Sequence, residues 1–215
     1  MNLMDKAERK LYRLQIRPFF RYIIFAMAGV YLLQMFFPTF NLIGLLSLYM
    51  PAVFRGQLWR VLTFLIVPPI SSPLFVLLTM YFYYFIGTAL ENRWGARRVL
   101  LYYTIGASGA ILAALLTQYG TNTYLYLSMF FAFAILNPEN QVLLFFVVPV
   151  KMKWLAIINA VFFVYAFIIG SWAERIALLF SILNIILFFG GDIINLVSNS
   201  IAQWKRRQSF KNRRR

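Results

Sequence analysis

The sequence contains no cysteine and no histidine. Without cysteine, the chain forms no disulfide and offers no thiolate to a metal ion. Histidine is the commonest general base and the commonest metal ligand, so its absence argues against two kinds of active site at once. Acidic residues are also scarce, with 6 Asp and Glu against 21 Lys and Arg. We therefore predict neither a metal site nor a cofactor.

Apolar residues dominate what is present: 62% of the 215 residues are hydrophobic and 19% are aromatic. A water-soluble domain of this size does not have such a composition. Because a helical crossing needs about 20 apolar residues, the chain has room for six crossings. The predicted fold class is an all-α integral membrane protein. We expect spans at residues 20–37, 73–90, 99–118, 123–136, 154–170 and 176–197.

The remaining segments are predicted to lie at the membrane surface. Residues 39–72 hold apolar patches broken by prolines and a glycine, which favours interfacial helices in the first external loop. Residues 141–150 are apolar but too few to cross, so we expect them to be interfacial or buried. The predicted domains are a basic amphipathic N-tail (1–19), a membrane domain (20–198) and a basic C-tail (199–215).

The basic residues indicate an orientation. With these spans, 18 Lys and Arg fall on one side of the membrane and 3 on the other. The positive-inside rule then places both termini in the cytoplasm, in a plasma membrane. A net charge of +15 suggests nucleic acid in a soluble protein, but here the charges flank spans. We therefore expect anionic lipid headgroups as partners of the basic tails, and no nucleic acid.

Three motifs occur in order: GQLWR at residues 56–60, ALENRWGARR at 89–98, and NPENQ with PVKMKW within 137–154. In combination they resemble the rhomboid superfamily, including its inactive, derlin-like branch. The resemblance implies a six-helix rhomboid-like bundle with interfacial helices in the first external loop. The motif residues to which it gives a structural role are Gly56, Gln57, Trp59, Arg60, Glu91, Gly95, Pro138, Pro149 and Lys151.

An active rhomboid, as the resemblance implies, is an intramembrane serine protease with its serine in a GxSG motif at the start of span four and a histidine in span six. The chain has a GxSG at Gly106–Gly109, but in span three. Ser108 and Ser128 are thus only weak candidates for a nucleophile. Asn184 takes the position of the lost base, and an asparagine accepts no proton near neutral pH. All six lysines lie in predicted cytoplasmic segments, so none replaces it.

Other residues have a structural interpretation beside the functional one. Gly106, Gly109 and Ala113 give a small-residue face that favours close helix packing. Trp59 and Arg60 are interpreted as an interfacial anchor, as a clamp that holds the external loop into the bundle or touches a client, or as both. Glu91 is expected near the cytoplasmic boundary, paired with nearby arginines or the tails.

The predicted function is a rhomboid-like pseudoprotease: not an enzyme, but a protein that binds transmembrane clients and perturbs the bilayer in quality control or regulation. Two alternatives stay open. The first is an active rhomboid protease. The second is a small-solute transporter or channel, which the absence of a charged residue at mid-membrane disfavours.

Overall fold

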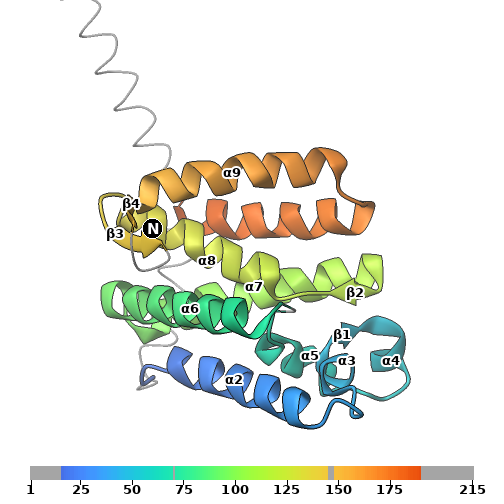
Figure 1. Ribbon diagram of the computed structural model, residues 1–215. Helices are drawn as coiled ribbons and strands as arrows, with labels where there is room; N and C mark the ends of the chain where they lie inside the picture. The colour runs from blue at the N-terminus through green and yellow to red at the C-terminus, as the bar shows by residue number, and fades with distance from the viewer. Residues whose placement is uncertain (1–15, 70, 145–147, 190–215) are drawn as a thin grey trace, which may run out of the picture.

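The computed structural model describes residues 16–69, 71–144 and 148–189, and every structural statement below concerns these residues. Six longer helices run side by side in a bundle (Figure 1). They are α2 (Phe20–Phe36), α6 (Pro73–Trp94), α7 (Ala96–Thr117), α8 (Thr123–Leu136), α9 (Met152–Ile169) and a last helix described from Trp172 to Phe189. These bounds lie close to the predicted spans, except that residues 190–197 of the sixth predicted span lie outside the described residues.

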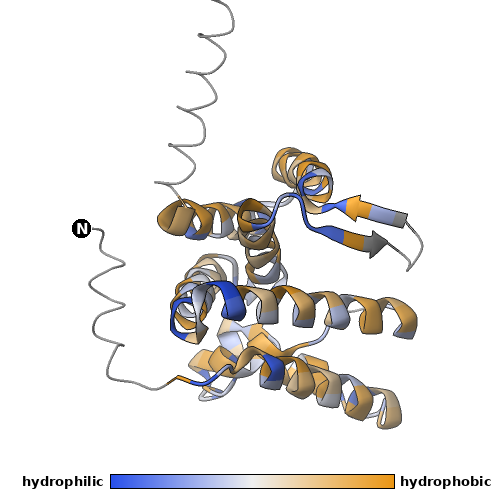
Figure 2. Cartoon of the chain, turned by 90° about the vertical axis from the view of Figure 1, so that its left-hand side faces the viewer, coloured by the Kyte–Doolittle hydropathy of each residue, from blue (hydrophilic) through white to orange (hydrophobic). Residues whose placement is uncertain are grey.

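Four of these helices, α6, α7, α9 and Trp172–Phe189, are long and apolar enough to cross a membrane. The helices α2 and α8 are apolar but shorter, at 17 and 14 residues. Apolar residues dominate along every long helix (Figure 2), and many of the large ones are exposed on the outside of the bundle. In α9, for example, only Met152 and Phe163 are buried. An apolar exterior of this kind is that of a membrane protein.

Helix α8 lies at the centre of the core, where it packs against α6, α7 and α9. Eight of its 14 residues are buried. Tyr126 stacks on Tyr83 of α6 with 4.1 Å between ring centroids. Its hydroxyl lies 3.3 Å from that of Tyr103 on α7. The shortest of the six longer helices is therefore also the one that the others enclose.

Residues 39–69 form a compact layer at one end of the bundle, here called the loop end (Figure 1). The layer consists of α3 (Leu42–Leu46), β1 (Leu48–Tyr49), α4 (Met50–Phe54), α5 (Arg60–Thr63) and the 3-10 turn η1 (Phe64–Ile66). Strand β1 pairs antiparallel with β2 (Tyr119–Gly120), which follows α7. The expectation of short helices in this loop is confirmed, and the strand pair is an addition to it.

The prediction of an all-α chain was wrong for residues 141–151. Strands β3 (Gln141–Leu144) and β4 (Val148–Lys151) pair as an antiparallel hairpin, which projects away from the helices (Figure 2). Valine favours extended backbone, and Pro149 is unsuited to a helix interior. The described residues are therefore mostly helical, with two small two-stranded sheets, and the six-helix rhomboid-like arrangement stays a prediction.

Most of the predicted N-tail (1–19) and the whole predicted C-tail (199–215) lie outside the described residues. Residues 16–19 are described and are not helical.

Candidate functional site

The side chain of Arg60 connects separate segments of the loop end through hydrogen bonds. It is only 6% exposed. One guanidinium nitrogen, Nη1, donates to the carbonyls of Gly44 at 2.6 Å and Ser47 at 2.8 Å, and Nε donates to Gln57 at 2.7 Å. Arg60 is therefore a buried clamp on the backbone of the loop, and it does not extend outward as a snorkelling anchor would. Trp59 beside it is half exposed, which suits an interfacial residue.

Two glycines of the predicted motifs adopt backbone that other residues rarely use. Gly56 has φ 101° in the turn before α5, and Gly95 has φ 81° between α6 and α7. A side chain at either position would be strained. Both glycines thus serve the turns of the chain and touch no cavity described below.

Glu91 has a role that the sequence did not indicate. Its carboxylate is buried, and Oε1 accepts the backbone N–H groups of Phe19 at 2.8 Å and Phe20 at 3.0 Å. These groups lie at the start of α2, where helix N–H groups have no partner within the helix. Glu91 therefore caps α2 from a helix about 70 residues away in the sequence, which local motifs do not reveal.

The third motif forms the base of the β3–β4 hairpin. Lys151 and Lys153 both bind Glu139, at 2.8 Å and 2.6 Å. The carbonyl of Pro138 accepts the N–H of Lys153 at 3.1 Å. Pro149 pairs with Leu143 in the hairpin. These residues shape the turn from α8 into α9, at the opposite end of α8 from β2.

The GxSG motif at residues 106–109 has two faces. Ser108 is exposed on the outside of α7, where its hydroxyl donates to the carbonyl of Thr104 at 2.8 Å. Gly109 faces inward, where a Cβ atom would lie 3.3 Å from Phe180 of the last helix. Ala113, one turn further, is buried. The small residues lie where helices approach closely, and the serine faces away from every described candidate partner.

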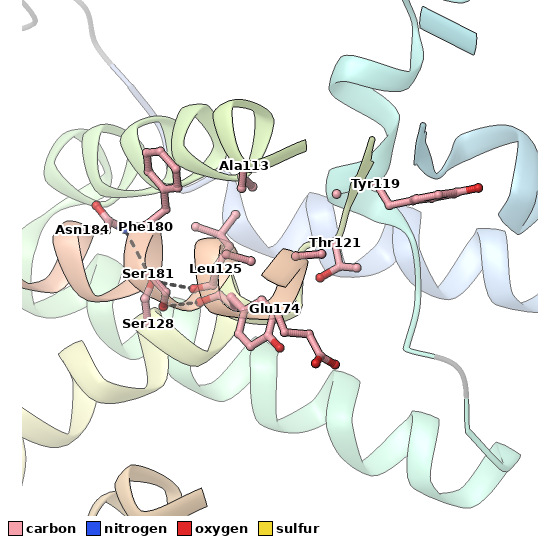
Figure 3. A pocket seen from close by; sticks show the side chains of 15 residues that line it. Ala113, Tyr119, Thr121, Leu125, Ser128, Glu174, Phe180, Ser181 and Asn184 are labelled. Atoms are coloured by element: carbon pink, nitrogen blue, oxygen red, sulfur yellow. Dashed lines mark hydrogen bonds between the residues drawn. The ribbon is translucent and has the colours of Figure 1, made fainter. Parts of the chain in front are cut away.

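A cavity of about 130 Å³ lies between α7, α8 and the last helix. Tyr119, Thr121 and Glu174 line it at the loop end, and Ser128, Ser181 and Asn184 line its inner part (Figure 3). Its walls are made of small or apolar residues: Gly106, Ala110, Ala113, Leu125, Ala173, Ala177 and Phe180. The cavity is thus a narrow, largely apolar space with polar groups at both ends.

Ser128 and Asn184 meet in this inner part. The amide nitrogen of Asn184 lies 3.5 Å from the Ser128 hydroxyl oxygen and 3.4 Å from the carbonyl of Tyr102. Ser128 is fully buried, and its hydroxyl donates to the carbonyl of Leu125 at 2.7 Å. The structure thus brings together the serine that was a candidate nucleophile and the asparagine that was named as the position of the lost base.

The chemistry of this pair is limited. An amide nitrogen donates and accepts no proton, so Asn184 cannot activate the Ser128 hydroxyl as a base would. Ser128 also lies in the second turn of α8, where its own N–H belongs to the helix ladder and is not free to hold an oxyanion. The arrangement suits a structural or ligand-binding contact between two helices.

Sequence reasoning missed two residues that line the cavity, Ser181 and Glu174, and the state of one buried residue outside the lining, Tyr102. Ser181 donates to the carbonyl of Tyr124 at 2.9 Å, and the i, i+3 spacing from Asn184 was a signal that both share a face. The Tyr102 hydroxyl is buried and has no hydrogen-bond partner among the described residues. Glu174 accepts the N–H of Ser171 at 2.7 Å at the start of the last helix, a contact that the capping spacing could have indicated.

No group of three metal-ligating side chains occurs in the part of the chain that the structure describes. Neither the scan against protein-family models nor the search of curated proteins found a match. The resemblance to rhomboids therefore rests on the three motifs and remains a prediction.

Proposed function

We propose that this chain is a rhomboid-like membrane protein without protease activity, which binds transmembrane segments of client proteins. The observation that carries the proposal is the Ser128–Asn184 contact at the inner end of the cavity. A serine protease needs a base within reach of the hydroxyl, and here the neighbour is an amide. The chain has no histidine at all.

The length of α8 supports a second part of the proposal, an effect on the bilayer. Its 14 residues span about 21 Å at 1.5 Å per residue, against about 30 Å for a hydrocarbon core. A short central helix is accommodated by local thinning, at a modest cost for each ångström of mismatch. A thinned bilayer would ease the lateral approach of a client helix. This effect is testable by spin-label depth or scattering measurements on reconstituted protein.

The topology belongs to the same proposal. Both termini would face the cytoplasm of a cell with the chain in its plasma membrane, which places the loop end outside. The basic tails and the pair Lys151 and Lys153 would then meet anionic headgroups. Labelling of single cysteines introduced at Thr121 and Glu139, in intact cells, tests this orientation. The proposal expects membrane-impermeant reagent to label the first position alone.

Protease activity decides between the proposal and its nearest alternative. Purified full-length protein in liposomes would be incubated with a model transmembrane substrate and the products read by mass spectrometry. We expect no product above that of Ser128→Ala and Ser108→Ala. Cleavage by the natural chain that disappears in one of these variants would show a protease. Solute flux in the same liposomes tests the transporter alternative, for which we expect no signal.

Client binding is tested by photo-crosslinking in native membranes. A crosslinking residue at Tyr124, which lines the cavity, is expected to give discrete adducts with other membrane proteins. The same residue at Val161, on the exposed face of α9, is the matched control and is expected to capture lipid. Identical adduct patterns at both positions would argue against a client site at the cavity.

A further inference from the structure

The β3–β4 hairpin lies at the end of the bundle opposite the loop end, where α8 ends and α9 begins (Figure 1). Helix α9 runs horizontally in Figure 1 and is seen end-on in Figure 2, where the two strands extend sideways from the bundle. The hairpin therefore runs crosswise to α9, which is long and apolar enough to cross a membrane. With α9 across the bilayer, the hairpin lies along the membrane surface.

The two faces of the hairpin differ in polarity. Val142 pairs with Val150, and the next pair along the strands is Gln141 with Lys151. Directly paired residues share a face, and successive pairs alternate between faces. Both valines are half-buried, and Val142 packs against the core of the bundle. Gln141 and Pro149, on the other face, are exposed. The valine face is therefore turned towards the helices, and the polar face is turned away from them.

Side chains at the base of the hairpin mark the depth of the membrane surface. Trp154, in the first turn of α9, is 56% exposed. Lys151 and Lys153 precede it, with side chains that are 42% and 39% exposed. Tryptophan and lysine are typical of the headgroup level. The exposed residues Ile157 and Ile158 follow one turn later, so the lipid-facing surface of α9 begins directly after the hairpin.

Contacts at the base hold the hairpin in this direction. The Glu139 carboxylate binds both lysines, with Oε2 on Lys151 and Oε1 on Lys153. The N–H group of Met152 donates to the carbonyl of Asn140 at 2.8 Å. The two strands are thus fixed at the points where they meet α8 and α9, and the valine face keeps its direction relative to the helices.

The edges of the hairpin favour a lipid surface over a partner strand. Pro149 has no N–H group, and proline on an exposed strand is a common means by which proteins prevent edge pairing. Both edges still carry backbone polar groups, which are costly within hydrocarbon but are satisfied by water and headgroups at the interface. Contact with lipid is therefore expected to be shallow.

We propose that the described strands of the β3–β4 hairpin form an arm on the membrane surface, with the valine face on the acyl chains of the adjacent phospholipid leaflet. The arm extends the apolar surface of α9 sideways. At its base two lysines face one glutamate, and the resulting positive charge suits lipid phosphate groups. The inference requires only that the chain spans a membrane, and it is independent of whether the chain binds clients or cleaves them.

The absence of cysteine from the sequence allows a nitroxide spin label to be attached at one introduced cysteine. The labelled full-length protein is reconstituted into nanodiscs of phosphatidylcholine and phosphatidylglycerol. Collision rates of the label are measured with oxygen, which concentrates among acyl chains, and with a nickel chelate, which stays in water. Val150→Cys reports on the valine face. Pro149→Cys, at the adjacent residue on the opposite face, is the matched control, and Gln141→Cys is a second control on that face.

We expect the ratio of oxygen to nickel collisions to be several-fold higher in Val150→Cys than in Pro149→Cys. It should approach the ratio in Val161→Cys, on the exposed face of α9. An equal or lower ratio at Val150→Cys than at both control positions would place the valine face in water and overturn the proposal. Low collision rates with both reagents at Val150→Cys would place that face against protein and would also overturn it.

Discussion

The amide nitrogen of Asn184 lies 3.5 Å from the hydroxyl oxygen of Ser128, although the two residues are 56 positions apart. Both are buried, and together they join α8 to the last helix. A contact of this length is a weak hydrogen bond. It holds a polar pair between apolar helices without the proton acceptor that hydrolysis needs. The geometry of this pair therefore favours a structural role over a catalytic one.

Replacement of Arg60 by alanine is expected to destabilise the loop end. The change leaves the carbonyls of Gly44 and Ser47 without their charged donor, at a cost of about 2–4 kcal/mol in the free energy of unfolding. Arg60→Lys is expected to recover only part of this, because a single ammonium cannot reproduce the guanidinium fork. Thermal unfolding in micelles measures both. Arg55→Ala, an exposed arginine, is the control, and an equal loss in it would contradict the clamp.

The helices were predictable because long apolar runs bounded by glycine, proline and charge are a local signal. The same signal placed α8 at residues 123–136, as observed. Non-local relationships were not accessible in this way. Strand β1 pairs with β2 some 70 residues later, and each is only two residues long, so neither leaves a periodic pattern in the sequence.

The candidate site was predictable in part for a similar reason. Motif order singled out Ser128 and Asn184, but their contact depends on how α8 packs against the last helix. The role of Glu91 as a cap for α2 depends on α6 packing beside α2. The hairpin at residues 141–151 was missed because a short apolar run is ambiguous between a buried helix and a strand.

Substitution of Gly95 by alanine is expected to cost about 1–3 kcal/mol of unfolding free energy, because φ 81° is unfavourable for a residue with a Cβ atom. No atom lies within 4 Å of the added Cβ, so the cost would come from the backbone alone. Gly29→Ala is a matched control, since its Cβ also meets nothing but the residue lies within α2. There alanine is expected to be neutral or to stabilise by up to about 1 kcal/mol. Equal effects on thermal unfolding would contradict this account.

The ion pairs at the hairpin make the stability of the folded chain depend on pH. Hydrogen bonds from Lys151 and Lys153 lower the pKa of Glu139 from 4.5 to about 2. Because the pKa is lower in the folded chain, the stabilisation is complete above about pH 4.5 and is lost as the pH falls towards 2. Carbon NMR titration of the Glu139 carboxyl measures this directly. In a variant with Lys151→Met and Lys153→Met, the midpoint is expected to return towards 4.5, and an unchanged midpoint would exclude the lysines as the cause.

Replacement of Asn184 by leucine tests whether the buried polar pair serves stability. Leucine has the same branched arrangement of heavy atoms and removes the oxygen that lacks a partner, at the expense of a weak contact to Ser128. We expect the free energy of unfolding to stay unchanged or to rise by up to about 2 kcal/mol. Asn184→Asp has the same shape but adds a buried charge without a cation in the lining, and is expected to lose more than about 3 kcal/mol. Chemical unfolding in micelles compares the three chains. A loss above about 2 kcal/mol in the leucine variant would show that the asparagine stabilises the bundle, whereas equal or higher stability would show that it does not.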